Sequence, residues 1–358
     1  MIKPQRFAAL AAATAASVLA AAVLYSITNR WTAGKVEGAS LIPGLARQEK
    51  AIATVEIQQG EKKTTLLRDG EQWKVKERAG YPANPERVRK LLTALAAAEL
   101  IEPKTASKDR HKQLELEDPA AKDAKSRGIR ILDAKGKPLA EVVLGKSRYD
   151  AFGSGKGGVY VRRLAEAQTW LATGEPKGSA EFKDWVSTAA FETDTSKVTR
   201  LTLEHPGEEA LVIEKGAVEK TVVEKGGPQG GAKDATDQKF KLAKMPEGKK
   251  LKQGVTVEQI PQAFSSIEME DVRRIEATPV GDNVSVLKLE SEGGMVTTFR
   301  LRKEGDISWL SFQATGGEGD IKKKADEISA KGAGWEFKIP QWKAEQIGKR
   351  RADLFETS

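Results

Sequence analysis

Apolar and polar residues alternate along several short stretches of the chain, the pattern that predicts β-strands with one buried face. In the first half the alternation covers residues 53–57, 64–68 and 72–76. Asp69-Gly70 separates the last two stretches and is typical of a hairpin turn. We therefore expect three consecutive antiparallel strands at the start of the main body of the chain.

A change of period to that of an α-helix follows these strands. Asn84 is a suitable N-cap, Pro85 suits the first helical position, and Glu86 adds negative charge to the first turn. The helix that this predicts has one apolar face, made of Val88, Leu91, Leu92, Leu95 and Ala98. Further strands are predicted on both sides of the turn at 133–136, at 158–162 and at 169–171.

The second half repeats this order. Strands are predicted at 198–203, 210–215, 239–242, 286–289 and 297–301, and a helix at 257–267 that Pro261 must shorten or shift. Val257, Ile260 and Phe264 have the mutual spacing of Val88, Leu91 and Leu95. Two more segments match in order: residues 308–310 with 169–171, and 336–338 plus Trp342 with 181–183 plus Trp185. These matches predict an internal repeat.

Strands that cluster, instead of alternating singly with helices, favour an α+β fold with antiparallel sheets. We predict an N-terminal transmembrane helix followed by two repeated units of antiparallel sheet plus helix. The expected divisions are a cytoplasmic tip and anchor at 1–30, a stalk at 31–50, a first unit at 51–190 and a second, diverged unit at 191–358. The glycine-rich residues 225–233 are predicted to enlarge a hairpin loop of the second unit.

The N-terminus carries an uncharged run from Phe7 to Ile27, whose 21 residues would span about 31 Å as a helix. Lys3 and Arg6 precede it, and the positive-inside rule then places the tip in the cytosol. We expect a single-pass protein of the inner or cytoplasmic membrane with a periplasmic or extracellular main part. A cleaved signal peptide that ends near Ala20–Ala22 is the alternative, and it exports the same part.

Composition narrows the classes of function. The chain has 59 basic and 51 acidic residues, a net charge of +8, and the two signs are interleaved. This describes a solvated surface and argues against nucleic-acid binding, which needs clustered basic residues with stacking aromatics. Cysteine is absent, which excludes disulfides, thiolate metal sites and cysteine nucleophiles.

Candidate chemistry is sparse. Residues 144–147, Leu-Gly-Lys-Ser, lack the earlier glycine and the following helix of a phosphate loop, and residues 153–158 resemble a dinucleotide loop only in their glycines. His111 and His205 are far apart and flanked by polar residues, so we expect surface roles for both. We predict no catalytic, cofactor-binding or metal site and no cofactor. Glu268, Glu270 and Asp271 form an acidic group expected at a helix end.

The tryptophans fall mostly on predicted strands, where core packing is the favoured interpretation. The alternative is a surface that binds a sugar or peptide, and its candidate aromatics are Trp73, Trp170 and Trp309.

From Gln72 to about Val186 the chain carries an ordered set of short motifs: 73–75, 80–83, the helix 88–95, 136–139, 143–146, 159–162 and 169–171. In this order they resemble the bacterial family known as domain of unknown function 4340 (DUF4340). The resemblance implies a single-anchor envelope protein, often encoded beside ABC-type exporter components of the kind linked to gliding motility. It carries over no catalytic residues.

We therefore expect a membrane-anchored extracytoplasmic interaction module, accessory to an ABC-type exporter and in contact with its permease or another envelope protein. Two alternatives from other classes are an envelope hydrolase that uses a carboxylate pair and a protein that binds glycan or peptidoglycan.

Overall fold

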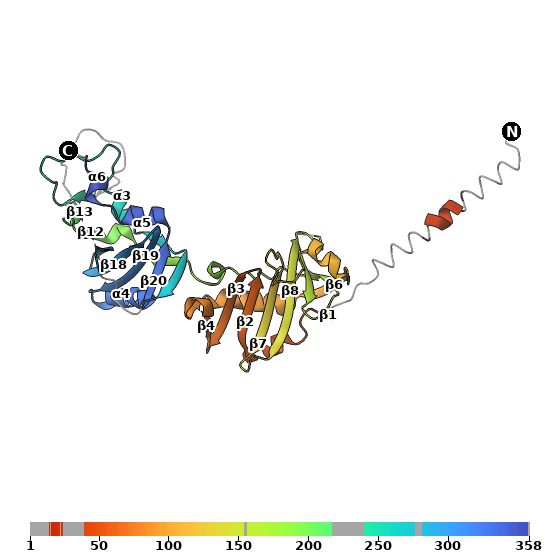
Figure 1. The fold of residues 1–358 in the computed structure, drawn as a ribbon. Coiled ribbons are helices and arrows are strands. Elements are labelled where there is room, and N and C mark those ends of the chain that lie inside the picture. Colours follow the sequence, from red (N-terminus) through yellow and green to blue (C-terminus); the bar gives the residue numbers. More distant parts are fainter. Residues whose placement is uncertain are drawn as a thin grey trace, which may run out of the picture. The chain divides into compact units, whose positions relative to one another are not determined.

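The computed structural model describes residues 14, 16–21, 23, 39–153, 156–216, 240–275 and 281–356. The chain divides into two compact units, Met1–Val186 and Ser187–Ser358. Each unit is built around one large antiparallel sheet with a few helices (Figure 1). The expected α+β architecture with antiparallel sheets is confirmed.

The first unit holds a ten-stranded sheet in the order β1-β6-β10-β9-β8-β7-β2-β3-β4-β5. Its strands are β1 (Ala39–Ser40), β2 (Ile52–Gln59), β3 (Lys62–Asp69), β4 (Gln72–Val75), β5 (Tyr81–Ala83), β6 (Glu99–Pro103), β7 (Arg127–Asp133), β8 (Pro138–Arg148), β9 (Gly158–Arg163) and β10 (Trp170–Thr173). Its helices are η1 (Leu45–Ala51), η2 (Lys76–Arg78), α2 (Pro85–Ala97), η3 (Lys108–Leu114) and η4 (Phe182–Trp185), of which all but α2 are 3₁₀ helices.

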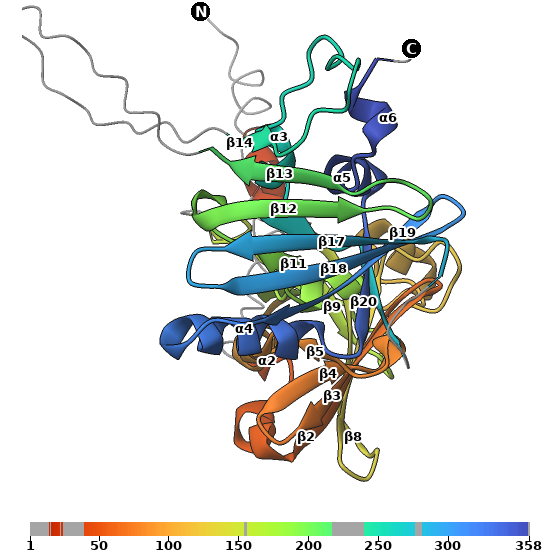
Figure 2. The same ribbon diagram turned by 90° about the vertical axis from the view of Figure 1, so that its left-hand side faces the viewer.

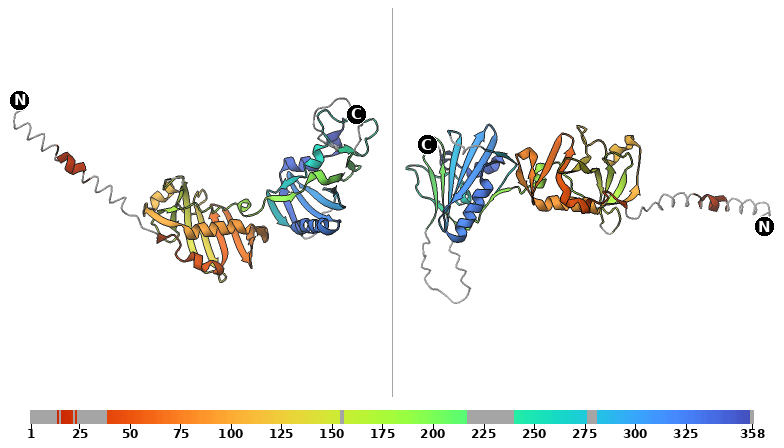
Figure 3. Two further views of the ribbon diagram at one scale, coloured as in Figure 1. Left: turned by 180° about the vertical axis from the view of Figure 1, so that it is seen from behind. Right: turned by 90° about the horizontal axis from the view of Figure 1, so that it is seen from below.

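Helix α2 covers one face of this sheet (Figure 3). The side chain of Asn84 accepts hydrogen bonds from the backbone N–H groups of Glu86 and Arg87, at 3.0 and 3.4 Å, and so caps the helix as predicted. The apolar side chains that the helical spacing selected are buried, namely Val88, Leu91, Leu92 and Leu95. They pack toward the core with Val55, Ile57, Leu66, Ile129, Ile131 and Leu144, none of which is exposed.

The other face of the first sheet is partly covered by the connection between β6 and β7. Leu116 of this connection is fully buried, and its carbonyl oxygen accepts a 2.9 Å hydrogen bond from Nε of Arg162 on β9. Pro119 lies over β7, where only a glycine, Gly128, leaves room for it. The backbone of the connection also comes close to strand β8, where the carbonyl oxygens of Leu114 and Glu115 lie against Gly145. The connection is therefore a structural cover of the sheet and not a loose loop.

The second unit holds an eight-stranded sheet in the order β14-β13-β12-β17-β18-β19-β20-β16 and a small sheet of β11 and β15. Its strands are β11 (Ala189–Glu192), β12 (Val198–Glu204), β13 (Leu211–Lys215), β14 (Phe240–Leu242), β15 (Ser266–Glu268), β16 (Asp271–Arg274), β17 (Val284–Ser291), β18 (Met295–Glu304), β19 (Ile307–Thr315) and β20 (Trp335–Ile339). Its helices are η5 (Thr195–Lys197), α3 (Gln259–Gln262), α4 (Gly319–Gly332), α5 (Gln341–Ile347) and α6 (Arg351–Leu354). Figure 2 shows β13, β12, β17 and β18 side by side.

The two large sheets share one strand order. Without its edge strands β1 and β5, the first sheet is β4-β3-β2-β7-β8-β9-β10-β6, and the second is β14-β13-β12-β17-β18-β19-β20-β16. The repeat inferred from the sequence is therefore present as a repeat of connectivity. Helix α4 is an addition to the second unit, because β9 and β10 are joined by a short loop where β19 and β20 are joined through α4.

Two of the proposed sequence matches are wrong. Trp170 begins β10, whose counterpart is β20, so its topological equivalent is Trp335, which begins β20, and not Trp309 on β19. Residues 336–338 lie on β20, whereas residues 182–183 belong to the 3₁₀ helix η4. The inserted helix α4 shifts the last strands of the second unit along the sequence, so these segments of similar sequence do not occupy equivalent strands.

Two predicted elements also need correction. The helix expected at 257–267 is only the single turn α3, and residues 266–268 form strand β15, although Val257, Ile260 and Phe264 are all buried as their spacing indicated. Pro261 lies within this turn. The expected stalk ends earlier than residue 50, because Leu41, Ile42 and Leu45 are buried in the first unit and β1 pairs with β6.

Most of the predicted membrane span, Phe7 to Ile27, lies outside the described residues, which here are only 14, 16–21 and 23. Within the part of the chain that the structure describes, no helix has both the length and the apolar character needed to cross a membrane. The glycine-rich residues 225–233 also lie outside the described ranges.

Candidate functional site

The second sheet has one apolar and one charged face, because side chains alternate along each strand. The helices pack on the apolar face: Ala325 of α4 is buried with Met295 and Ala314, and the ring of Phe264, just after α3, lies 5.1 Å from that of Phe299. We call the opposite face the open face. It carries Arg200, Glu204, Glu214, Asp271, Arg273, Lys288, Glu290, Arg300, Arg302, Glu304, Trp309, Glu336 and Lys338.

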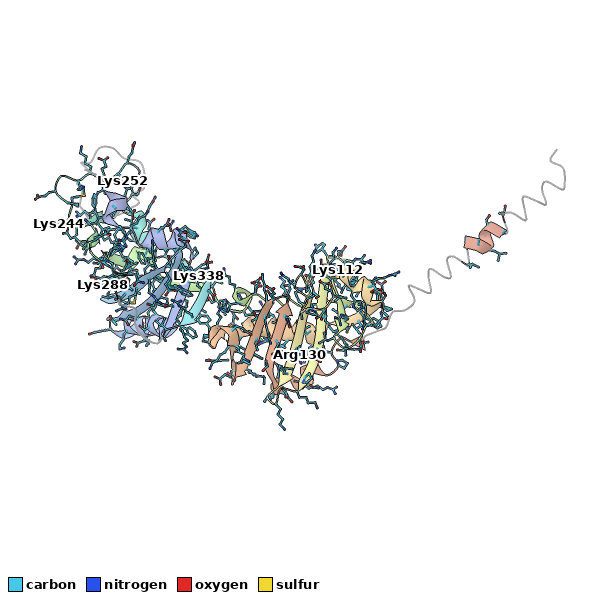
Figure 4. All side chains as sticks on the ribbon, in the orientation of Figure 1. Lys112, Arg130, Lys244, Lys252, Lys288 and Lys338 are labelled. Carbon is cyan, nitrogen blue, oxygen red and sulfur yellow. The ribbon has the colours of Figure 1, made fainter. Side chains whose placement is uncertain are left out.

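Neighbouring strands of the open face are linked by ion pairs of opposite charge. Arg200 on β12 lies directly opposite Glu214 on β13, with 2.8 Å between Nη2 and Oε1. Lys288 on β17 bonds Glu204 on β12 at 2.7 Å, and Figure 4 labels Lys288 and Lys338 on this unit. Such exposed pairs contribute about 0–1 kcal/mol each. Their main effect is to hold long side chains in defined positions across the sheet.

A denser cluster lies where β16, β18, β19 and β20 meet. Glu336 on β20 is fully buried, and its Oε2 accepts hydrogen bonds from Nε and Nη2 of Arg273 at 3.0 and 2.9 Å. Arg302 on β18 donates to Oε1 of Glu336 at 3.1 Å. Arg273 also makes a two-pronged bond to Glu304 at 3.0 and 2.8 Å, and its guanidinium carbon lies 3.8 Å from the ring centre of Trp309.

The charges of this cluster stabilise one another. The hydrogen bond from Arg273 holds the pKa of Glu304 below its usual value, and the charges of Arg273 and Arg302 act in the same direction. The same hydrogen bond to Glu304, helped by Glu336, raises the pKa of Arg273. Glu304 is therefore unsuited to act as a proton donor at neutral pH, and its charge is held within the ion-paired cluster.

The first unit carries a smaller charged ladder on the corresponding part of its sheet. Arg130 on β7 donates to Glu141 on β8 at 2.7 Å and contacts Glu56 on β2 at 3.4 Å. Lys63 on β3 reaches the same Glu56 at 3.2 Å. The hydrogen bond to Glu141 raises the pKa of Arg130, which is labelled in Figure 4. Both sheets thus present ion-paired rows of side chains on a partly uncovered face.

The candidate ligand-surface tryptophans do not form one surface. Trp73 and Trp309 are 7% and 8% exposed, so neither offers an open ring to a ligand: Trp73 is packed in the first unit, and Trp309 lies on the open face beneath the guanidinium of Arg273. Trp170 is half-buried on β10, between Val161 on β9 and Pro103 on β6. The described tryptophan with a largely exposed ring is Trp342 on α5, at 58%.

Both histidines are buried, at 6% and 7% exposure, which corrects the expected surface roles. Nε2 of His111 donates to the carbonyl oxygen of Ala167 at 2.8 Å, and His205 is bonded through both ring nitrogens. Most residues next to His111 and His205 in the sequence are polar, so the local pattern did not predict their burial. The acidic residues 268, 270 and 271 lie on and between β15 and β16 and not at a helix end; Glu270 pairs with Lys338 at 3.2 Å.

The glycine-rich motifs have structural explanations. Residues 144–147 lie within strand β8, where the pairing with β9 shifts register between Leu144 and Ser147. Gly145 is needed there because the carbonyl oxygens of Leu114 and Glu115 approach its α-carbon closely. Strands β8 and β9 are antiparallel neighbours, and in the described part of their connection the Lys156 N–H donates a hydrogen bond to the Gly153 carbonyl oxygen.

Replacing Gly145 with alanine is expected to lower the free energy of unfolding by about 1–3 kcal/mol. The new Cβ would lie 2.3 Å from the Leu114 oxygen and 2.8 Å from that of Glu115, and both are backbone atoms that cannot turn away. Urea denaturation measures the effect. Lys146→Ala, at the adjacent exposed position, is the control and should change stability by less than about 0.5 kcal/mol; equal effects would show that the close approach is unimportant.

Among the residues that the structure describes, no group of three or more histidine, cysteine, aspartate or glutamate side chains is placed to hold a metal ion.

The family model described as "Domain of unknown function (DUF4340)" matches residues 73–294, which is 222 of the 358 residues. The chain belongs to the DUF4340 family. The match runs from β4 to the end of β17 and so crosses from the first unit into the second. No curated protein and no solved structure matches the chain.

The motifs that carried the resemblance to DUF4340 are mostly interior residues. Trp73, Val75, Tyr81 and Ala83 are each at most 7% exposed, and burial raises the pKa of the Tyr81 hydroxyl to about 12. Val88, Leu91, Leu92 and Leu95 on α2 are buried as well, and so are residues 143–144, 159 and 161 on β8 and β9. This part of the family signature therefore reflects packing of the first sheet and not a reaction site.

Proposed function

We propose that this DUF4340 protein is a membrane-anchored extracytoplasmic interaction module that uses the open face of its second sheet to dock a partner protein. The observation that carries the proposal is the charge-paired face from β13 to β16, opposite the face on which α4 and the segment after α3 pack. A sheet face with fixed charges offers specificity through matching charges on a partner. Anchoring and export rest on the N-terminal run from Phe7 to Ile27.

The partner that the family resemblance suggests is the membrane subunit of an ABC-type exporter. A protein anchored by one helix diffuses in the same membrane as that subunit, which raises the effective concentration of a docking surface. The charged residues of the open face are balanced in sign, so the expected contact is a patterned polar surface and not a bulk attraction of opposite charges.

Affinity purification of the full chain in mild detergent tests the partnership. We expect an exporter membrane subunit to be recovered with the wild-type protein and lost with the double variant Arg200→Glu/Lys288→Glu on the open face. The matched control is Lys322→Glu/Lys323→Glu on α4, which makes the same change in charge at exposed positions away from that face. Recovery of no transporter subunit by the wild type would reject the exporter partnership; equal recovery by both variants would reject the open face as the contact.

A further inference from the structure

A cleft of about 370 Å³ lies at the end of the second sheet, beneath the connection between α5 and α6. Its lining includes His205, which directly follows β12, and Ser285 on β17. The antiparallel register places Leu203 opposite Leu287, and its continuation brings His205 to Ser285. Both side chains are only 7% exposed, yet both face the cleft. A buried serine and histidine thus meet at its wall.

The hydrogen bonds determine which nitrogen of His205 carries the proton. Nε2 lies 3.0 Å from the carbonyl oxygen of Lys349, which can only accept, so Nε2 is the protonated nitrogen. Nδ1 is then unprotonated and accepts the hydroxyl proton of Ser285, at 2.8 Å. The serine oxygen is already bonded to a neutral imidazole, which is the arrangement of a nucleophile with its general base.

Surrounding groups keep the imidazole neutral. Burial lowers the pKa of His205, and the positive charge of Arg350 adds to this, against the hydrogen bond to Lys349 and the charges of Glu208 and Asp353. The carboxylate of Asp353 accepts a hydrogen bond from the backbone N–H of Arg350 at 2.8 Å, and that of Glu345 accepts one from the side chain of Gln341 at 2.9 Å. Lys303, Lys349 and Arg350 are the cations that line the cleft, and Arg350 is paired with Glu208.

We propose that the cleft is an esterase site in which Ser285 is the nucleophile and His205 the general base, acting on carboxylic esters that carry a negative charge. Oγ of Ser285 forms a bond to the ester carbonyl carbon while its proton passes to Nδ1 of His205. The carbonyl of Lys349 holds Nε2–H and positions the imidazolium. The tetrahedral intermediate collapses, the bond to the leaving alcohol breaks, and that alcohol takes the proton from Nδ1.

Water then attacks the acyl-serine with its proton passing to Nδ1, and release of the acid returns the proton to Ser285. Lys303 and Lys349 provide the positive charge that stabilises the oxyanion and selects an anionic substrate, whereas Arg350 is paired with Glu208. His205 bonds Ser285 through Nδ1 and the carbonyl oxygen of Lys349 through Nε2. This carbonyl oxygen takes the place of the carboxylate in a serine–histidine–carboxylate triad. This activity would lie outside the open face and is independent of the docking role.

Labelling with a fluorophosphonate reagent tests the nucleophile in the full chain. We expect one modified residue, Ser285, identified by mass spectrometry, and no labelling of Ser285→Ala. Ser308→Ala removes a similarly buried serine, 4% exposed on β19, and should label as the wild type does. Folded wild-type protein that is unlabelled at Ser285 would overturn the proposal.

Hydrolysis of two 4-nitrophenyl esters, the acetate and the singly charged succinate, tests the base and the substrate class. We expect the succinate to react faster, Ser285→Ala to reduce both rates to background, and His205→Gln to reduce them about 100-fold. Melting curves confirm that each variant is folded, and Ser285→Ala, which removes one oxygen atom, decides the outcome if His205→Gln unfolds. Unchanged rates in Ser285→Ala would overturn the site, and equal rates with both esters would overturn the preference for a charged substrate.

Discussion

Replacing Phe299 with alanine is expected to lower the free energy of unfolding of the second unit by about 3–5 kcal/mol. Phe299 on β18 is fully buried and lies at the centre of an aromatic cluster. Its ring centre is 4.8 Å from that of Phe191, 5.1 Å from that of Phe264 and 6.1 Å from that of Phe312. These rings come from three separate parts of the unit, so the cavity left by alanine cannot be closed by one side chain. Urea denaturation followed by tryptophan fluorescence measures the loss.

Trp342→Ala is the control for this prediction, because it removes a larger aromatic ring that is 58% exposed. We expect it to change stability by less than about 0.5 kcal/mol. If the two variants were equally stable, burial of the cluster would not be what holds the unit together.

The double replacement Arg273→Met/Arg302→Met is expected to destabilise the second unit by about 3–5 kcal/mol. It leaves Glu336, which has no exposed surface, without either of its cationic partners. The loss comes mainly from a carboxylate that is buried and unpaired, and much less from the lost attraction. Chemical denaturation of the full chain measures it.

The informative control adds Glu336→Gln to the double variant. A neutral amide can remain buried without a counter-charge, so the triple variant should recover part of the lost stability. Removal of an exposed pair by Lys322→Ala on α4 should cost less than about 0.5 kcal/mol. A triple variant as unstable as the double variant would show that the arginines act through packing and not through the charge of Glu336.

Local signals in the sequence predicted most strands and the principal helix correctly. Alternation located β2, β3 and β4, and the Asn84-Pro85 start located α2, because both depend on residues close together in the chain. Strands β6 and β16 pair with β10 and β20, which lie far along the chain, and no local pattern specifies such partners. The same limitation explains the wrong match of Trp170 with Trp309. The sequence does not show that helix α4 is an insertion, and this becomes clear only from the pairing of β19 with β20.

The cleft was missed although a signal for it exists. Leu201, Leu203 and His205 alternate toward the apolar face of β12, and Ser285, Leu287 and Leu289 do so on β17. A histidine and a serine at inward positions of two strands suggest a buried polar pair. Their contact depends on the pairing of β12 with β17, about 80 residues apart, which the sequence does not specify.

The shared strand order has a consequence for how the chain folds. Within each sheet, strands β7 to β10 and β17 to β19 are joined by hairpins or short loops and can pair early. Strand β16, in contrast, pairs with β20 at sequence separations of 61 to 67 residues, from Arg274–Trp335 to Asp271–Lys338. Closing so long a loop is entropically unfavourable and slow. Strand β16, which closes one of these long loops, carries Arg273, and the bonds of Arg273 to Glu336 form only in the correct register. The ion-pair cluster therefore favours the correct register of β16 on β20 over shifted pairings, in which Glu336 would be buried without Arg273.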